Sequence, residues 1–527
     1  MINKQKNKNN IKKLNIMLGF NDLEIGAFDT PKHLSKFFIK EFNLFDKWLN
    51  GSTIFDPTMG EGNLLVSLIE YGIEKGYLIK NLPIQNLYGN ELNTQKYNKA
   101  IENLSKYIDK DNYFLITNFT NKDIFELEIN KKFDIIFGNP PFVNFNDLNE
   151  EYKDKIKKHF INLGLVKNKK DVLLGNSRVD IASAVILKCI KDFLSDYGNL
   201  YFFVPMSIFL NDGANKNFRT YQIDGIDFKL NVLYDLNLKI KDKNLLFNVD
   251  TRYGFVHIIK NIPTEFPIEY KILIKKQLKS DSFESKKAKP LIEKTNFLSV
   301  FDENVDFNLD RLKINKENKP RQGINTCGTN DIFIFDSYDI YDETNVAVSN
   351  KEIKKTIILP HKFIFPLLTS QNFNGSNDAK KWVLLPYNTD GSVLNMEELK
   401  KHENLYQYFV ENKDRLINRK GVLLKSILNK KNIWWALLGV SKYNFYPYKI
   451  VWESFGKKEF KPMLFDSNWQ ANQSLQSYIP VKNKEEALKI LDYLNSENTK
   501  KYIYSYLSEG TMNFAQPGRI KNLFEIK

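Results

Sequence analysis

Short apolar runs alternate with helical patterns between Ser52 and Lys260. The apolar runs are rich in β-branched and aromatic residues, which is typical of buried strands. In chain order they read STIFDP, NLYGNE, NYFLIT, FDIIFG, LYFFVP and YGFVHIIK. Apolar residues at helical spacing predict helices that begin near Asn63, Thr94 and Asp180. Alternation of this kind predicts an α/β fold with a largely parallel sheet that helices cover on both faces.

The pattern changes after a lysine-rich interval between Lys275 and Lys294. Beyond it the chain mixes short strands with turns and closes on the helical pattern KEEALKILDYLNSENTKKYIYSYL. This change predicts a separate second domain of mixed α/β structure. The expected division is a flexible basic tail over residues 1–20, a first domain over 21–265, a linker region over 266–295 and a second domain over 296–527.

Composition adds several constraints. A chain of 527 residues exceeds one ordinary core, and its net charge of +14 suits a polyanionic partner, although Lys, Asn and Ile recur throughout. The two cysteines, Cys189 and Cys327, lie far apart, so we expect no disulfide and a reducing compartment. No apolar run is long enough to cross a bilayer and no signal peptide is recognisable, so we expect a cytoplasmic protein without a membrane partner. The histidines have no metal-spaced companions, and no metal site is predicted.

The run FDIIFG ends in the turn Asn139-Pro140-Pro141-Phe142. Proline has no amide hydrogen for a sheet ladder and keeps its predecessor out of the helical region, so the strand must stop in a stiff turn. The Asn139 side-chain oxygen and the Pro140 carbonyl then offer two acceptors beside the ring of Phe142, which suits a planar amino group. A rigid apolar turn without a ligand is the plainer interpretation, and the neighbouring strand ends decide against it. The polar residues 143–179, which include KNKK, predict a mobile loop beside this turn.

An earlier strand end carries an acid followed by glycines. The segment IFDPTMGEGNLL places Asp56 and Pro57 at the end of a strand, then Gly60 and Gly62 in a loop, and then the start of a helix. Glycine lets the backbone approach a ligand closely, and a helix start presents free amides to it. A plain tight turn explains this segment equally well when it is taken alone.

Two more strand ends follow. One carries Gly89-Asn90-Glu91, where an acid can accept from both hydroxyls of a ribose. Asp123 follows the NYFLIT run, where an acid can accept from the amino group of an adenine. Each acid alone is typical of a solvated strand end, whereas the ordered series favours a nucleotide site.

The order of these segments resembles the γ-type N6-adenine DNA methyltransferases, the family of the Thermus aquaticus adenine-specific enzyme. That family has a Thr-Pro segment, DPxxGxG, an acidic strand end, a further Asp and then NPP(Y/F). Here GAFDTPKHLSKFF supplies Thr30-Pro31, and the other motifs follow in the same order. The resemblance covers the first half of the chain and implies a Rossmann-like class I S-adenosylmethionine-dependent methyltransferase domain over residues 21–265.

The resemblance implies S-adenosylmethionine as the cofactor, across the carboxyl ends of the strands. Thr30 and Asp56 are expected to hold its methionine part, Glu91 its ribose and Asp123 its adenine. The implied cofactor-binding residues are Thr30, Pro31, Asp56, Pro57, Gly60, Gly62, Glu91, Leu92, Asp123 and Ile124, of which Leu92 and Ile124 pack on the adenine.

The resemblance also implies that Asn139, Pro140, Pro141 and Phe142 are catalytic. Their implied substrate is an adenine flipped out of duplex DNA. Phe247 falls where the family has a second aromatic ring against the target base, although a core phenylalanine fits this position as well.

The second half carries a weaker resemblance. RQGINTCGTNDIFIF resembles the glycine-rich opening of the family's target-recognition domain, although Cys327 interrupts the usual Thr-Gly pair. This implies that residues 296–527 read the DNA sequence. The interleaved aromatic and basic residues suit DNA contacts, and Trp434, Trp435 and Tyr446 fit a buried core equally well.

The preferred interpretation is a site-specific DNA adenine-N6 methyltransferase that binds double-stranded DNA as a monomer, in a restriction-modification or solitary epigenetic role. An RNA adenine-N6 methyltransferase has the same site chemistry and stays open, as does a DNA-binding subunit of a larger defence complex. A release-factor glutamine methyltransferase also carries NPPY but does not need the second half. Because no stretch is left for a nuclease domain, any partner restriction endonuclease is expected on a separate chain.

Overall fold

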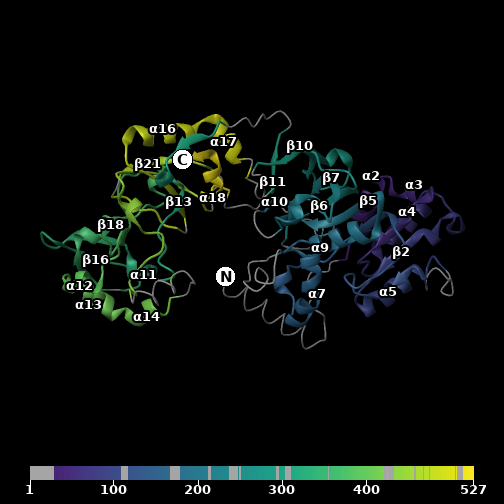
Figure 1. The fold of residues 1–527 in the computed structure, drawn as a ribbon, viewed down its shortest axis with the longest axis horizontal. Coiled ribbons are helices and arrows are strands. Elements are labelled where there is room, and N and C mark those ends of the chain that lie inside the picture. The colour runs from purple at the N-terminus through teal and green to yellow at the C-terminus, as the bar shows by residue number, and fades with distance from the viewer. Residues whose placement is uncertain are drawn as a thin grey trace. The chain divides into compact units, whose positions relative to one another are not determined.

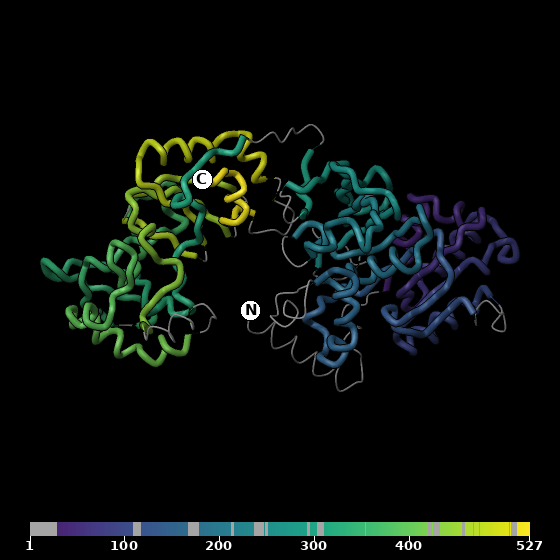
Figure 2. The backbone as a smooth tube through the Cα atoms, in the orientation of Figure 1, coloured from purple at the N-terminus to yellow at the C-terminus, as the bar shows by residue number. Residues whose placement is uncertain are grey.

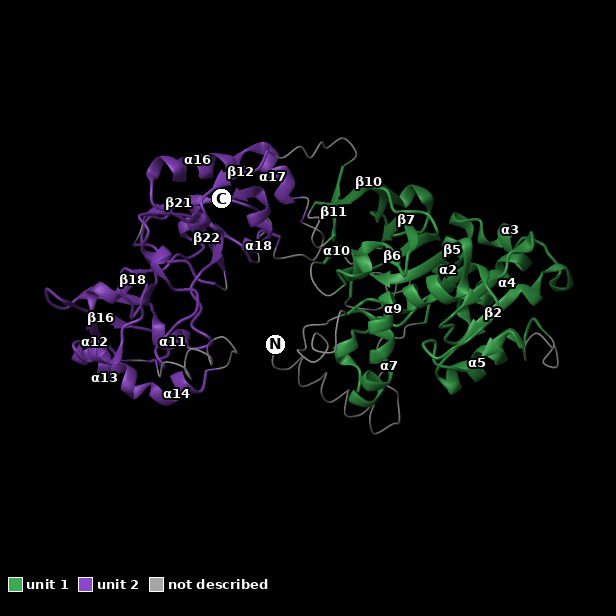
Figure 3. Cartoon of the chain, viewed as in Figure 1, with its two compact units in different colours: residues 1–305 green, residues 306–527 purple. Residues whose placement is uncertain are grey.

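The computed structural model divides the chain into two compact units, Met1–Val305 and Asp306–Lys527 (Figure 3). It describes residues 29–108, 117–166, 179–211, 215–236, 247, 251–291, 296–302, 310–353, 355–419, 424, 433–455, 459–466, 468–473, 475–504, 506 and 514–527. The predicted tail over 1–20, most of the NYFLIT run and the KNKK lysines lie outside these residues. None of the helices in the described ranges is long and apolar enough to cross a membrane.

Unit 1 is an α/β unit built on one large sheet (Figure 1). Its helices are α2 (Lys32–Glu41), α3 (Leu44–Leu49), α4 (Asn63–Glu74), α5 (Thr94–Leu104), α7 (Glu150–Asn162), α9 (Ile181–Lys188) and α10 (Ser207–Leu210). Its strands are β1 (Ile54–Asp56), β2 (Leu87–Asn90), β3 (Phe119–Thr120), β4 (Phe133–Gly138), β5 (Leu194–Pro205), β6 (Gln222–Ile223), β7 (Ile226–Asp235), β8 (Tyr253–Lys260), β9 (Ile268–Leu273), β10 (Phe283–Pro290) and β11 (Leu298–Phe301). The predicted α/β fold is confirmed.

The main sheet has the strand order β11-β10-β9-β7-β8-β5-β4-β1-β2-β3. From β3 to β5 every neighbouring pair is parallel, so these strands all end at one edge. Beyond β5 the sheet is mixed, because β8 runs antiparallel to both β5 and β7. The expectation of a largely parallel sheet therefore holds only for the half that carries the motifs.

Side chains of successive strand residues point to opposite faces of the sheet, and each face has its own core. Ile54 packs in a cluster with residues of α2, α3, α4 and α5, whereas Phe55 packs in a second cluster with residues of α9. In β4, Ile135 and Phe137 belong to the first cluster and Ile136 to the second. Helices thus cover both faces, and Figure 2 follows the chain through this arrangement from the purple α2 onward.

The interval 266–295, expected as a linker, instead contains β9 and β10, which extend the main sheet of unit 1. Only Ala288 is buried in β10, and the three lysines of its sequence FESKKAKP lie at half-buried positions. Strands near the end of a sheet commonly carry lysine because it discourages pairing with other chains. The lysine content that suggested a linker therefore belongs to a sheet margin.

Unit 2 is built from small sheets and short helices. Its strands are β12 (Leu312–Ile314), β13 (Arg321–Gln322), β14 (Ile334–Phe335), β15 (Ser337–Ile340), β16 (Asn345–Ser349), β17 (Ile357–Pro360), β18 (Ile364–Pro366), β19 (Trp382–Leu384), β20 (Tyr448–Glu453), β21 (Met463–Asp466), β22 (Gln476–Val481) and β23 (Phe524–Ile526). Its helices are α11 (Asn330–Phe333), α12 (Met396–Lys400), α13 (Glu403–Glu411), α14 (Lys413–Ile417), α16 (Lys484–Asn495), α17 (Glu497–Tyr504) and α18 (Pro517–Ile520). Trp434 and Trp435 are buried in its core, and Tyr446 is buried as well.

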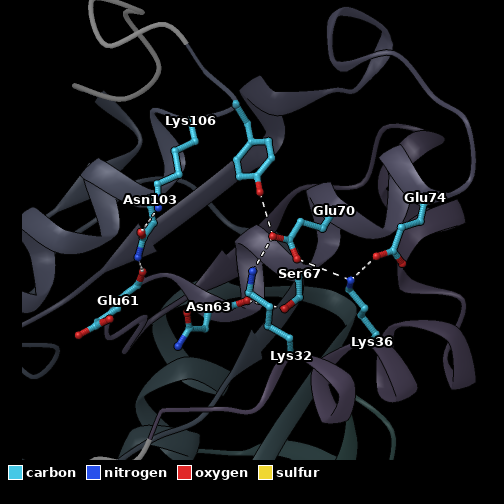
Figure 4. Close-up of polar contacts among 10 residues, drawn as sticks. Lys32, Lys36, Glu61, Asn63, Ser67, Glu70, Glu74, Asn103 and Lys106 are labelled. Carbon is cyan, nitrogen blue, oxygen red and sulfur yellow. Dashed lines mark hydrogen bonds and ion pairs between the residues drawn. The ribbon is translucent and has the colours of Figure 1, made fainter.

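A charged cluster ties together the helices beside the predicted cofactor motifs (Figure 4). Glu70 of α4 pairs with Lys32 of α2 at 2.6 Å and lies 3.6 Å from Lys36, which also pairs with Glu74. The Tyr107 hydroxyl, beyond the end of α5, donates to the same Glu70 carboxylate at 2.9 Å. Since α2 follows the Thr-Pro segment and α4 follows the glycine loop, this cluster fixes the helices that position both segments.

We expect Glu70→Gln to lower the stability of unit 1 by about 1 kcal/mol, because the carboxylate accepts two hydrogen bonds in a partly exposed setting. Burial alone would raise the pKa of Glu70, but hydrogen bonds from Lys32 and Tyr107 and the nearby lysine charges lower it. The contribution of Glu70 to the free energy of unfolding is therefore complete above the pKa that Glu70 has in the unfolded chain. It is lost as pH falls through the lower pKa that Glu70 has in the folded state.

Thermal melts of wild type and variant across pH measure this effect, and the difference between them should shrink in acid. Glu102→Gln is the matched control, because Glu102 forms an exposed pair with Lys99 within α5. A control variant as unstable as Glu70→Gln would contradict the assignment.

Candidate functional site

A pocket lies at the carboxyl ends of the parallel strands, where β1, β2, β3 and β4 pass into loops. It encloses about 940 Å³, including the part open to solvent. The predicted site residues that line it are Thr30, Asp56, Pro57, Gly60, Glu91, Leu92, Asp123, Ile124, Asn139 and Pro141. Pro31, Gly62, Pro140, Phe142 and Phe247 are not among its lining residues. Segments spread over more than 100 residues of sequence thus meet in one place, as open α/β sheets favour.

The glycine loop between β1 and α4 uses its two glycines differently. Gly60 has φ +56° and donates its amide hydrogen to Oε2 of Glu91 at 2.9 Å, which brings the loop onto the end of β2. Gly62 has φ +81° and directly precedes α4, and a Cβ there would lie 3.3 Å from the Cβ of Ala100. Gly60 therefore shapes the pocket wall, while Gly62 allows the start of α4 to pack on α5.

Glu91 is held from both sides by backbone amides. Gly60 donates to Oε2, and Asn93 donates to Oε1 at 2.8 Å. Burial raises the pKa of Glu91, and the hydrogen bonds from Asn93 and Gly60 oppose that rise. The carboxylate is thereby fixed in orientation at the pocket wall, with lone pairs left for a ligand that donates hydrogen bonds.

Asp56 is almost completely buried, with 1% of its surface exposed. Its Oδ1 accepts from the amide of Thr58 at 3.2 Å, while Oδ2 has no hydrogen-bond partner within the described part of the chain. Burial, together with the negative charge of Glu91, raises the pKa of Asp56 well above its usual value. A buried carboxylate oxygen without a partner favours a ligand that brings positive charge or a hydrogen-bond donor.

Asp123 also lines the pocket and contacts a helix that the sequence pattern did not predict. Its Oδ1 accepts from the amide of Phe125 at 3.0 Å, and its Oδ2 lies 3.2 Å from Nζ of Lys155. Lys155 also pairs with Glu126 at 3.1 Å, and Tyr152 of the same helix lines the pocket. Burial, followed by the charge of Asp123, raises the pKa of Tyr152. Helix α7 therefore forms part of the pocket wall beside Asp123.

The Asn139 turn is joined to the Thr-Pro segment. Nδ2 of Asn139 donates to Oγ1 of Thr30 at 3.1 Å, and Thr30 is buried. The bond uses one donor of the carboxamide and so fixes which way its oxygen points. Two residues predicted for different ligands are thus in direct contact.

Phe142 belongs to a group of aromatic rings beside the pocket. Its ring centroid lies 6.3 Å from that of Phe247 and 6.1 Å from that of Tyr253. Phe247 is itself packed against Phe203 and donates its amide hydrogen to the Tyr253 hydroxyl. The structure therefore brings Phe247 to the Asn139 turn, although 105 residues separate Phe142 from Phe247 in the printed sequence.

Asn90 connects the ends of three strands. The motif Gly89-Asn90-Glu91 did not predict this role. Its buried Nδ2 donates to the carbonyls of Pro57 and Lys122, at 3.2 and 3.0 Å. Its Oδ1 accepts from the Thr120 hydroxyl and from the Lys122 amide. The side chain of Asn90 therefore joins the loops after β1 and β3 to the end of β2.

A family model described as N-6 DNA Methylase matches residues 20–227. The matched segment lies within unit 1. The matched segment includes every predicted site residue except Phe247.

Several solved structures are similar to the chain. The type IIL restriction-modification enzyme MmeI, solved in complex with DNA, is 14% identical with a TM-score of 0.48, over 86% of this chain and 60% of its own. The type IIG restriction endonuclease BpuSI is 15% identical with a TM-score of 0.41, over 94% of this chain and 58% of its own. A type I methyltransferase subunit from Streptococcus thermophilus is 21% identical with a TM-score of 0.32, over 47% of each chain. The chain thus spans less than two thirds of these proteins.

We expect Asn90→Ala to destabilise unit 1 by about 2 kcal/mol or more, because it leaves buried groups of Pro57 and Lys122 without partners. Denaturant unfolding measures the loss. Asn86→Ala is the control, because Asn86 directly precedes β2 and donates an exposed hydrogen bond to the Gly51 carbonyl. Equal losses in the two variants would show that Asn90 has no special role.

Proposed function

We propose that the chain is a site-specific DNA adenine-N6 methyltransferase of the γ type, with S-adenosylmethionine as methyl donor. One observation carries the proposal. The pocket of Asp56, Glu91 and Asp123 ends at Asn139, so a nucleotide-type site and an amino-group socket share one wall. The match to the N-6 DNA methylase family over residues 20–227 supports the same chemistry.

The residues present fit this cofactor. S-adenosylmethionine carries positive charge on its sulfonium and amino groups, and the partnerless oxygen of buried Asp56 suits a positively charged group. Glu91, oriented by two backbone amides, suits the ribose hydroxyls, and Asp123 suits the adenine amino group. Leu92 and Ile124 line the pocket beside these acids and suit the faces of the adenine ring.

Asn139 and Pro140 are proposed to act on the target adenine. The amino nitrogen of adenine is a poor nucleophile, because its lone pair is delocalised into the ring. Acceptance of its two hydrogens by Oδ1 of Asn139 and the carbonyl of Pro140 favours a pyramidal nitrogen. These two dipoles also stabilise the positive charge that develops on that nitrogen, so no strong base is needed.

Phe142 is proposed to stack on the flipped base. Turning a base out of the duplex costs a few kcal/mol, and stacking on an aromatic ring returns about 1–3 kcal/mol. Phe247 and Tyr253 support this ring at centroid distances of about 6 Å, and Phe247 is proposed to contact the base as the second aromatic.

Unit 2 is proposed to recognise the DNA sequence, with double-stranded DNA as partner and any restriction endonuclease on a separate chain. In unit 2 the guanidinium of Arg321 in β13 stacks on the ring of Tyr443, 3.8 Å from the ring centroid, which fixes its orientation. The buried Trp434 and Trp435 are excluded as surface contacts.

We expect Asn139→Ala to abolish methyl transfer while leaving cofactor affinity within a small factor, because the side chain acts on the amino group of the base. Labelled methyl transfer onto duplex DNA and onto structured RNA, together with calorimetry, measures both quantities. Asn162→Ala, at an exposed position at the end of α7, is the control. A clear preference of the wild type for RNA would overturn the DNA assignment.

We expect Glu91→Ala to weaken cofactor binding about 10- to 100-fold with little change in DNA affinity, because it removes a charged hydrogen-bond acceptor. Calorimetric titration with S-adenosylmethionine measures the change. Glu61→Ala is the control within the same loop, since Glu61 does not line the pocket. Normal cofactor affinity in Glu91→Ala would show that the motif placement is wrong.

A further inference from the structure

Another buried carboxylate, Asp180, lies close to the Asn139 turn but is not among the residues that line the pocket. It directly precedes α9 and is 5% exposed. Its Oδ2 accepts from Nδ2 of Asn215 at 2.7 Å and from the hydroxyl of Ser207 at 3.1 Å. Its backbone amide donates to Oδ1 of Asn215 at 3.2 Å. The side chain and backbone of Asp180 thus both engage the same carboxamide.

The backbone on either side of Asp180 holds the chain that leaves the Asn139 turn. The Phe145 amide donates to the Val179 carbonyl at 2.8 Å, and the Ile181 amide donates to the Val143 carbonyl at 2.9 Å. Val143 directly follows Phe142, and the two prolines before Phe142 are stiff. The position of residues 179–181 therefore fixes the position of Val143 and Phe145, and through them that of the Asn139 turn.

The partners of Asp180 come from the neighbouring strand end. Ser207 begins α10, two residues after the last residue of β5, and β5 is the parallel neighbour of β4 in the sheet. Asp180 therefore links the loop that leaves β4 to the loop that leaves β5. It makes this link in an apolar surrounding, since Val179, Ile181 and Val143 all belong to one hydrophobic cluster.

Burial of a carboxylate is costly, and here it raises the pKa of Asp180 to about 6. An apolar side chain would pack in this cluster without that cost. The carboxylate oxygen, however, can accept from Asn215 and Ser207 at the same time, which an apolar side chain cannot do. The hydrogen bonds of Asp180 therefore do more to fix the positions of Asn215 and Ser207 than to raise the stability of the fold.

We propose that Asp180 is a positioning residue, which with Asn215 and Ser207 fixes the Asn139 turn relative to the end of β5. This inference rests on the proposed function for its effect on methyl transfer, but not for its effect on the turn. Asp180 is not among the residues that line the pocket, so it acts through the turn rather than on a ligand.

Three variants of the full chain test the proposal. Asp180→Ala removes the acceptor, Asp180→Asn keeps one oxygen for both donors, and Asp134→Ala is the matched control. Asp134 accepts from the amide and the hydroxyl of Thr53 at 2.9 and 2.8 Å, at the other end of β4. The control therefore removes a carboxylate of equal hydrogen bonding from the same strand, away from the turn.

Amide hydrogen exchange measures how firmly the turn is held, and it needs no substrate. We expect faster exchange over residues 139–145 in Asp180→Ala, rescue in Asp180→Asn and no change in Asp134→Ala. In methylation assays kcat of Asp180→Ala should fall about 10- to 100-fold, with KM for S-adenosylmethionine changed far less.

Unchanged exchange over residues 139–145 in Asp180→Ala would overturn the proposal. Faster exchange over the whole of unit 1, or failure of Asp180→Asn to rescue, would reduce Asp180 to a general stabilising residue and also overturn it. If the exchange results are as expected but the wild type methylates no nucleic acid, the proposed function fails and the positioning role stands.

Discussion

The site depends on one constraint, which is that four parallel strands end at the same edge and their loops must be held together without a regular ladder. Asn90 meets much of this constraint, since its carboxamide joins the loops after β1 and β3 through two carbonyls and two donors. Glu91, the next residue, binds the amide of Gly60 in the glycine loop. Two consecutive residues thus hold the loops after β1 and β3 at the end of β2.

The same edge gathers buried acids, and each is compensated in its own way. Glu91 receives two backbone amides, Asp123 lies beside Lys155, and Asp180 receives Asn215 and Ser207. Asp56 differs, because among the described residues its Oδ2 has no hydrogen-bond partner and its carboxylate forms no ion pair, and its pKa is raised well above the usual value. Uncompensated burial of this kind is a cost in the free protein, which a cationic ligand can offset. The distribution of partners therefore points to Asp56 as the acid that most needs a ligand.

Local signals in the sequence predicted much of unit 1. The helices that begin at Asn63 and Thr94 and the strand Phe133–Gly138 lie where the apolar pattern placed them, because each buries one side of a regular element. The prediction of a linker over residues 266–295 was wrong. Lysines near the edge of a sheet and lysines in a linker have the same sequence pattern when the neighbouring strands are not known. Lys155 and Asp180 could not be found either, since their partners are fixed only by the packing of α7 and α9 on the sheet.

In unit 2, close backbone packing explains the glycine of the motif RQGINTCG. The glycine of RQGINTCG has a packing reason, because a Cβ on Gly323 would lie 2.3 Å from the carbonyl oxygen of Ala471. The carbonyl of Gly323 in turn lies 2.9 Å from where a Cβ on Gly439 would be. Three backbone segments thus cross at contact distance, which accounts for two glycines without any ligand. The DNA recognition proposed for unit 2 would then depend on side chains around this crossing, such as the Arg321 that stacks on Tyr443, rather than on the glycines that define the motif.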